Sequence, residues 1–341
     1  MKAAVLTAPE RLELQEVPTP VAGDGEVLVA LEYCGICTLE QRLFTGAVKM
    51  PLPLIPGHEA SGVVASSGRG LFSPVPAGTP VALDLVTRCG ECYYCRIGQS
   101  NLCLNRFQNG RKVLGGFGEY IAVAAKQVFT VPAGVPLQEA AFAEPVACCI
   151  RSLKKVGVSL AEDLLVVGAG PMGLMHLMVA QCLGARVFVS DPDRARREKA
   201  RELGAFLCAD PGAEDLPRLI KGHTEGRGAD AAVVASPAHE ALKSAVDSVS
   251  KNGRINIYTS YSDPPVLPVD ANTVHRDQIL ITGSEGRTEH DFLQAVRLIS
   301  FRRLNLAALI SELTSFRNIG EGMRAAMSPA TYRVLLEHRA A

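Results

Sequence analysis

The spacing of apolar and polar positions along the chain changes near residue 149. Before this point, short apolar runs are separated by turns rich in Pro and Gly at 18–20, 51–57 and 74–80, which predicts strands joined by turns. The predicted strands are 3–6, 12–14, 26–32, 62–65, 80–83 and 119–123. We therefore expect residues 1–148 to form a mainly antiparallel β unit of the small-barrel type.

From residue 149 to 282, short apolar runs alternate with longer segments of helical spacing. The predicted strands are 164–168, 186–191, 207–210, 230–235, 254–259 and 278–282, and the predicted helices are 171–184, 193–204, 213–222 and 238–250. This alternation predicts βαβ units and a doubly wound parallel sheet. The tail, 283–341, contains a helix-like segment at 292–303. It is too small to fold alone, so we expect it to complete the first domain.

Composition limits the possible classes of protein. A chain of 341 residues, 48% of them hydrophobic, favours two globular domains. Lys plus Arg equals Asp plus Glu at 35 each, so no basic field for nucleic acid or an anionic membrane is expected. Neither a signal peptide nor an apolar run of membrane-spanning length is apparent. We expect a soluble, cytoplasmic protein of enzyme size.

A glycine-rich turn follows the first strand of the second domain. Apolar residues 164–167 lead into Gly168, Gly170, Pro171, Met172 and Gly173, which match the pattern G-x-G-x-x-G before a helix. In such a turn the glycines permit a tight bend, close approach of a pyrophosphate, and close packing of helix on strand. The pattern alone is a weak signal, but its place between a strand and a helix strengthens it.

An acidic residue lies where a dinucleotide site needs one. Asp191 ends the strand at 186–190, roughly 20 residues after the glycines, and a carboxylate there hydrogen-bonds the adenosine ribose. The same charge repels a 2′-phosphate and favours NAD over NADP. Arg194, Arg196 and Arg197 temper that preference. They form either a solvated helix face or, at Arg196, a cofactor contact.

Four of the ten cysteines, Cys89, Cys92, Cys95 and Cys103, fall in one short window. Steps of C-x2-C bring thiolates together on one Zn2+ ion, and a site filled by four cysteines leaves no position for substrate. We therefore expect a structural zinc there. Redox-active or coincidental cysteines are the alternative.

A second metal site is predicted from residues that are farther apart. Cys37 follows a predicted strand, His58 and Glu59 precede another, and Glu144 lies in an apolar stretch where a carboxylate needs a partner. One Cys, one His and one or two Glu leave a position open, as catalytic zinc requires. Spacing alone equally allows a core histidine and a carboxylate at a helix start.

The ordered motifs resemble those of the zinc-dependent medium-chain dehydrogenase/reductase family, nearest to its sorbitol (polyol) and threonine dehydrogenase branch. The resemblance covers essentially the whole chain. It rests on the segments at 34–37, 56–62, 89–103, 115–120, 143–145, 168–173 and 281–284. It implies a GroES-like β-barrel catalytic domain, 1–148 completed by 283–341, and a Rossmann NAD-binding domain, 149–282.

The resemblance also implies roles for individual residues. Cys37, His58 and either Glu59 or Glu144 would bind catalytic zinc, and Arg333 resembles a basic residue that approaches the cofactor pyrophosphate. The reaction implied is oxidation of a secondary alcohol, a polyol or sugar, to a ketone with NAD. Two zinc ions per chain and a homodimer or homotetramer are further expectations.

The sequence departs from this family at the proton relay. A Ser or Thr two residues after the zinc cysteine and a His five residues after it usually carry the proton, but these positions hold Leu39 and Arg42. Thr38, Glu40, Glu59 or ordered water are the candidates to replace them. The alternatives to the expected function are an NADPH-dependent reductase of the same fold and a non-catalytic NAD-binding relative.

Overall fold

The structure is a computed structural model that describes residues 1–106, 114–267 and 269–338. Two compact units make up the chain: 1–147 with 287–341, and 148–286. We propose that these units are the two domains expected from the sequence.

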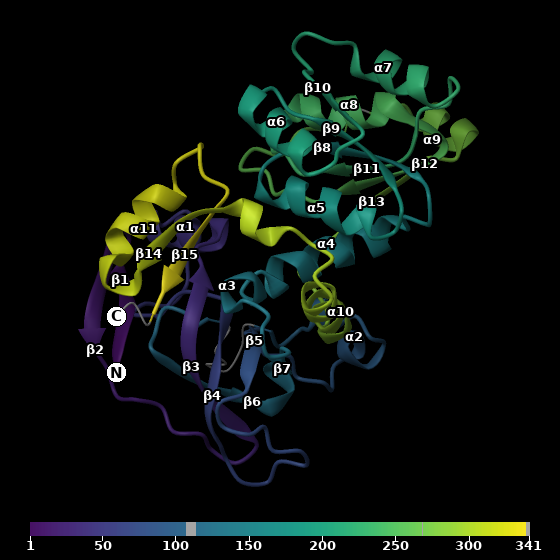
Figure 1. Cartoon of the computed structure of the whole chain (residues 1–341). Helices are drawn as coiled ribbons and strands as arrows, with labels where there is room; N and C mark the ends of the chain where they lie inside the picture. Colours follow the sequence, from purple (N-terminus) through teal and green to yellow (C-terminus); the bar gives the residue numbers. More distant parts are fainter. Residues whose placement is uncertain (107–113, 268, 339–341) are drawn as a thin grey trace. The chain divides into compact units, whose positions relative to one another are not determined.

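The first unit is built mainly from antiparallel strands (Figure 1). One sheet has the order β14-β15-β3-β4-β5-β7, with β6 also paired to β3, and β1 pairs with β2 in a separate ribbon. The strands are β1 (Lys2–Ala8), β2 (Arg11–Glu16), β3 (Glu26–Gly35), β4 (Glu59–Ser67), β5 (Pro80–Asp84), β6 (Tyr120–Ala124), β7 (Val128–Thr130), β14 (Ile310–Ser315) and β15 (Arg333–Glu337). Alternate residues of β3, β4 and β5, such as Val27, Val29 and Leu83, fill a buried core.

The last part of the chain contributes strands and helices to this unit. Strand β15 pairs antiparallel with β3, placing Leu335 opposite Gly35, and β14 lies parallel to β15. The helices of this unit are α1 (Thr38–Phe44), α2 (Tyr93–Arg96), α3 (Leu137–Ala140), α10 (Glu289–Ser300) and α11 (Ile319–Ala326). The sequence pattern missed α1 because a helix of seven residues is too short to display a helical period.

The second unit is a doubly wound sheet of six parallel strands in the order β10-β9-β8-β11-β12-β13. Its strands are β8 (Asp163–Val167), β9 (Arg186–Ser190), β10 (Leu207–Ala209), β11 (Ala229–Val234), β12 (Val249–Ile257) and β13 (Leu280–Gly283). Its helices are α5 (Pro171–Gln181), α6 (Arg194–Glu202), α7 (Leu216–His223), α8 (His239–Ser248) and α9 (Ala271–Asp277), and they cover both faces of the sheet (Figure 1). Strand β8 is buried along its whole length, which explains its continuous apolar run.

Helix α4 (Ala143–Val156) was not predicted from the sequence, and the boundary between the two units falls within it. Glu144 therefore lies in the first turn of a long helix. Its carboxylate is favoured there by the helix dipole, but it is buried, so it also needs a charged partner.

Candidate metal centres and dinucleotide turn

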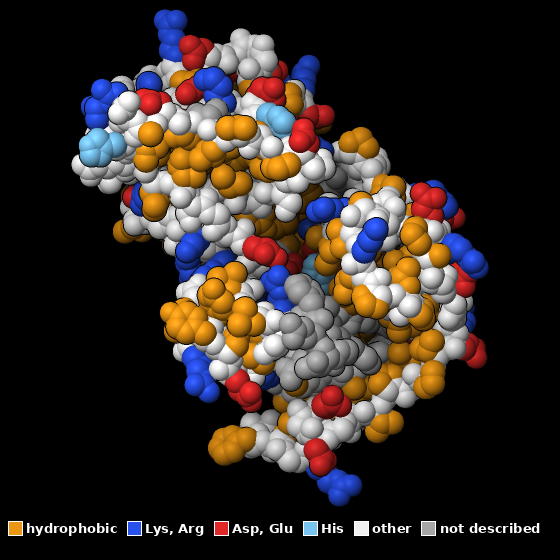
Figure 2. All heavy atoms as spheres, turned by 180° about the vertical axis from the view of Figure 1, so that it is seen from behind, with side chains coloured by type: hydrophobic (Ala, Val, Ile, Leu, Met, Phe, Trp, Pro, Cys, Tyr) orange, Lys and Arg blue, Asp and Glu red, His pale blue; other side chains and the backbone are white. Residues whose placement is uncertain are grey.

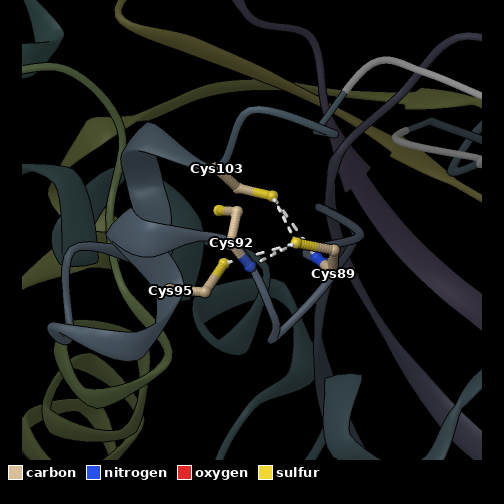
Figure 3. Close-up of side chains that lie close together, drawn as sticks. All are labelled: Cys89, Cys92, Cys95 and Cys103. Atoms are coloured by element: carbon tan, nitrogen blue, oxygen red, sulfur yellow. Dashed lines mark hydrogen bonds between the residues drawn. The ribbon is translucent and has the colours of Figure 1, made fainter.

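The four cysteines of the 89–103 segment, here called the cysteine lobe, bring their sulfurs close together (Figure 3). All four sulfurs lie within 4.8 Å of one another, with Cys89 Sγ 3.5 Å from Cys103 Sγ and 3.9 Å from Cys95 Sγ. None is in a disulfide. Zn–S bonds of about 2.3 Å in a tetrahedron separate sulfurs by about 3.8 Å. The lobe therefore fits a zinc ion held by four thiolates.

Hydrogen bonds and burial shift the pKa values of these thiols in opposite directions. The N–H of Cys92 donates to Cys89 Sγ at 3.3 Å, and this and neighbouring donors lower the pKa of Cys89 to about 6. Burial instead raises the pKa of Cys95 to about 12. Around them, Tyr93 and Ile97 are exposed, so the lobe has little apolar core of its own. A metal ion is therefore the means available to hold it.

The second group, here called the mixed centre, comprises Cys37, His58 and Glu59, whose ligand atoms lie within 4.8 Å of one another. Adjacent strands bring it together: Gly35 at the end of β3 pairs with Glu59 at the start of β4. A Cβ at position 35 would lie 2.2 Å from Glu59 Oε2, so glycine leaves the room that this carboxylate occupies. Cys37 follows two residues later as the N-cap of α1.

Glu40, in the first turn of α1, orients this centre. Its buried carboxylate lies 2.6 Å from His58 Nδ1 and accepts the N–H groups of Cys37 at 3.1 Å and Gly57 at 3.2 Å. With Nδ1 engaged, Nε2 is the ring nitrogen left to face a metal. Burial lowers the pKa of His58, but Glu40, Cys37 and Glu144 outweigh it and raise that pKa well above its usual value.

Arg333 lies beside the same centre. Its Nη2 is 3.3 Å from Glu59 Oε1, and its Nη1 donates to the carbonyl of Ile36 at 3.2 Å. Burial raises the pKa of Cys37, and it also raises the pKa of Glu59 although Arg333 opposes the shift. The contacts described here tie Arg333 to Glu59. The approach to a cofactor pyrophosphate stays a prediction.

Glu144 reaches the mixed centre from α4. Its Oε2 lies 4.0 Å from His58 Nε2, while its Oε1 forms an ion pair with Arg287. Glu144 is outside the group whose ligand atoms all lie within 4.8 Å. The structure thus brings both candidate carboxylates to the centre, Glu59 more closely than Glu144.

The positions around the predicted relay differ in exposure. Thr38 is exposed in the first turn of α1, and Arg42 is exposed on the same helix. Leu39 is partly buried against an apolar cluster built around Leu6, Leu43 and Leu114. Of the candidates to replace the usual relay, Thr38 combines a hydroxyl with access to solvent.

The glycine turn of the second unit has the geometry that a dinucleotide needs. Gly168 has a φ of +104°, and a Cβ on Gly173 would lie 1.8 Å from the carbonyl oxygen of Gly168. Gly170 is the N-cap of α5, and a Cβ there would meet nothing within 4 Å. Pro171 and Met172 form the first turn of the helix. Open space therefore faces the helix N-terminus, where a pyrophosphate binds.

Asp191 lies next to this turn. Its Oδ2 accepts the N–H of Ala169 at 2.7 Å, and its Oδ1 accepts the N–H of Asp193 at 2.8 Å. Arg196 Nη1 lies 4.0 Å from Asp191 Oδ2, and Arg197 forms an ion pair with Asp210 at 2.9 Å. The carboxylate and the Arg196 guanidinium are thus neighbours, which leaves the choice between NAD and NADP open.

Three buried charged residues near the mixed centre were missed in the sequence. Asp84 ends β5 opposite Glu59, Arg88 directly precedes the cysteine lobe, and Arg287 precedes α10. Their burial depends on long-range pairing between strands and segments, so no local pattern marks them.

On the face shown in Figure 2, charged side chains of both signs are interspersed, consistent with the balanced composition. No helix among the described residues is long and apolar enough to cross a membrane.

A Rossmann-type sheet with a glycine turn, a mixed Cys-His-Glu group and a four-cysteine lobe defines a zinc-dependent dehydrogenase. Comparisons agree with this class. The alcohol dehydrogenase GroES-like domain model matches residues 23–133, and the zinc-binding dehydrogenase model matches 171–300. The chain belongs to the zinc-dependent medium-chain dehydrogenase family.

Individual relatives align along most of the chain. A sorbitol dehydrogenase of Halalkalibacterium halodurans is 27% identical over 340 residues, covering 98% of this chain and 99% of that protein. An L-threonine 3-dehydrogenase of Pyrococcus horikoshii is 32% identical over 306 residues, covering 88% and 87%. The structure of a zinc-binding dehydrogenase from Sinorhizobium meliloti bound to NADP superimposes with a TM-score of 0.92 at 26% identity, covering 99% of both chains.

Proposed function

We propose that this protein oxidises a secondary alcohol, a polyol or sugar-like substrate, to a ketone with transfer of hydride to NAD, using zinc at the mixed centre. The observation that carries the proposal is the donor set of Cys37, His58 and Glu59, held within 4.8 Å and oriented by Glu40. A half-buried sulfur, an imidazole nitrogen and a carboxylate suit zinc and leave a position for an oxygen ligand.

The two groups of ligands and the glycine turn have separate tasks. Cys37, His58 and either Glu59 or Glu144 would hold the ion, while Cys89, Cys92, Cys95 and Cys103 would hold a second, structural ion. When bound, zinc is a Lewis acid that makes an alcohol more acidic, and nicotinamide is the hydride acceptor. The glycine turn and Asp191 would hold the dinucleotide.

The proton of the alcohol must reach solvent through residues of this chain. Leu39 cannot carry it. The Glu40 carboxylate already contacts His58 and accepts two backbone N–H groups, which supports an orienting role rather than a relay. We favour Thr38, because its hydroxyl is exposed in the first turn of α1 beside Cys37. A Thr38→Val protein should then lose turnover at low pH more than at high pH, where hydroxide in the solvent accepts the proton.

The activity is tested by supplying polyols, sugars and amino alcohols with NAD and following NADH absorbance. Formation of NADH with a polyol, lost on chelation and restored by zinc, is the expected result. Amino alcohols belong in the screen because one aligned relative is a threonine dehydrogenase. No NADH from any alcohol, with zinc at the mixed centre, would contradict the proposal and favour the non-catalytic alternative.

An NADPH-dependent reductase of the same fold is the second candidate. Arg196 beside Asp191, and the NADP bound to the aligned Sinorhizobium meliloti protein, favour it. The two candidates differ in one comparison of cofactor affinity. Binding NAD at least about tenfold more tightly than NADP supports the first, since a carboxylate repels a 2′-phosphate, and the reverse order supports the second.

A further inference from the structure

Four buried side chains of alternating charge form a line in the first unit. Arg88 Nη1 lies 2.6 Å from Asp84 Oδ2, Asp84 Oδ1 lies 2.7 Å from Arg287 Nη2, and Arg287 Nη1 pairs with Glu144 Oε1. Each of the four residues is less than 7% exposed. The line ends at Glu144, whose other oxygen lies 4.0 Å from His58 Nε2.

Burying four charged side chains is unfavourable, so their arrangement must compensate for the lost solvation. Charges removed from water lose their solvation, and their mutual attraction repays this only where the geometry is good and each charge is paired. Here both oxygens of Asp84 and Oε1 of Glu144 each have a separate guanidinium nitrogen as partner. The planar fork of Arg287 spans Asp84 and Glu144 with separate nitrogens, which a lysine ammonium cannot do with fixed geometry.

We propose that Arg287 is the positioning residue for Glu144 at the mixed centre, and that Asp84 and Arg88 fix Arg287 in turn. The inference rests on the proposed metal site. By holding Oε1, Arg287 fixes the carboxylate plane so that Oε2 is directed at His58 Nε2. It also takes part of the negative charge of Glu144, as Arg333 does for Glu59.

The same line connects the mixed centre to the cysteine lobe. Arg88 is the residue before Cys89, and its Nη2 donates to the carbonyl of Arg287 at 2.8 Å. Within the lobe, Ser100 Oγ donates to the carboxylate of Glu289, two residues after Arg287. The lobe and the residue that precedes it thus each contact the segment that carries Arg287. Loss of order in the lobe should therefore loosen Glu144.

The test compares Arg287→Met with Arg186→Met as a matched control. Arg186 also pairs with a buried carboxylate, Asp163, at 2.6 Å, but in the second unit. Zinc in the full-length protein is exchanged for Co2+, and the affinity of the mixed centre is measured by visible absorption in competition with a chelator. A Cys37→Ala protein, whose lobe is intact, supplies the lobe contribution to be subtracted.

Arg287→Met should weaken Co2+ binding at the mixed centre by about ten- to a hundredfold, the range found when partners of metal ligands are removed. Arg287→Lys should recover part of this loss, because one carboxylate regains a positive partner. Arg186→Met should lower the melting temperature but bind Co2+ within about twofold of the wild type. Wild-type affinity in Arg287→Met, or equal losses in the two methionine variants, would overturn the proposal.

Asp84→Asn provides a milder change if Arg287→Met does not fold. It keeps Glu144 and Arg287 and removes only the charge behind them, so a smaller loss of Co2+ affinity is expected and no loss would count against the proposal. These affinities are measured without alcohol or dinucleotide. A protein that shows the predicted affinities but oxidises nothing would refute the proposed function and leave the role of Arg287 standing.

Discussion

The cysteine lobe and the mixed centre hold metal-ligand residues in opposite ways. The lobe takes four thiols from one short window, three of them half-buried and one buried, and nearby backbone N–H groups donate to their sulfurs. The mixed centre takes a half-buried thiol from the N-cap of α1, an imidazole and a carboxylate from the start of β4, and a second carboxylate from α4. His58, Glu59 and Glu144 are buried among Glu40, Arg333 and Arg287. One site is defined by spacing and the other by the fold.

This difference indicates what each site is able to do. Four thiolates saturate a zinc ion and make a closed site, whose use is to hold a loop together. A set with fewer close ligands, and with each carboxylate balanced by its own arginine, keeps a position for another oxygen. The charged residues around the mixed centre are therefore part of its chemistry.

The largest expected effect is on the mixed centre. Cys37→Ala should lower turnover on the order of a thousandfold, because Lewis-acid stabilisation worth several kcal/mol is lost. Steady-state NADH formation checks this. The same substitution at buried Cys34, which belongs to the apolar core and not to either metal group, is the control. Comparable losses in both proteins would show that packing, rather than metal binding, explains the effect.

The thiols of the two sites should react at different rates in metal-free protein. At pH 7 the Cys89 thiol, with a pKa of about 6, is mostly thiolate. Cys37, whose pKa is raised by burial, is almost entirely protonated. Iodoacetamide should therefore label Cys89 between about ten- and a hundredfold faster, as mass spectrometry of the peptides would measure. The difference should shrink as pH rises and Cys37 ionises. Equal labelling rates at pH 7 would contradict the predicted difference in thiol pKa between the two sites.

Glu40→Gln tests the support of the mixed centre. The amide places an NH2 group where the carboxylate now accepts from Cys37 and Gly57, so His58 should lose its fixed orientation. Zinc affinity at this centre should fall about tenfold, and titration with a chelator would measure it. Glu139→Gln, at a buried glutamate paired with Arg302, is the matched control. If Glu40→Gln binds zinc as tightly as the control, Glu40 does not orient the ligand.

The smallest effect on turnover is expected from the lobe. Cys92→Ser should remove the lobe metal and lower the melting temperature on the order of 10 °C, since several kcal/mol of folding free energy are lost. Turnover below the transition should fall by only about threefold, through the contacts that Arg88 and Ser100 make with the 287–289 segment. Complete inactivation of a folded protein would erase the distinction between a structural and a catalytic site.

The sequence predicted the cysteine lobe more firmly than the mixed centre, because the lobe is a local pattern and the mixed centre is assembled by the fold. The cysteine lobe and the glycine turn are local patterns, so spacing was enough to find Cys89 to Cys103 and Gly168 to Gly173. The mixed centre was predicted less firmly, because spacing equally allowed a core histidine and a carboxylate at a helix start: Cys37, His58 and Glu144 meet only through strand pairing and a helix. The roles of Arg287, Asp84 and Arg88 could not be predicted, because an isolated charged residue in a sequence carries no sign of being buried.

The same limit applied to the fold. The six strands of the second unit were predicted because a parallel sheet buried on both faces leaves continuous apolar runs. Helix α4 was missed, although its apolar positions were noted, because Pro145 in its first turn resembles a break in the sequence. Proline is tolerated there since the first N–H groups of a helix have no partner within it.

The central claim is that one chain carries two metal centres of different kind, and metal analysis tests it most directly. The purified protein should contain two zinc ions per chain, and Cys37→Ala should contain one. A wild-type protein with a single zinc, or a Cys37→Ala protein that keeps both, would contradict the account.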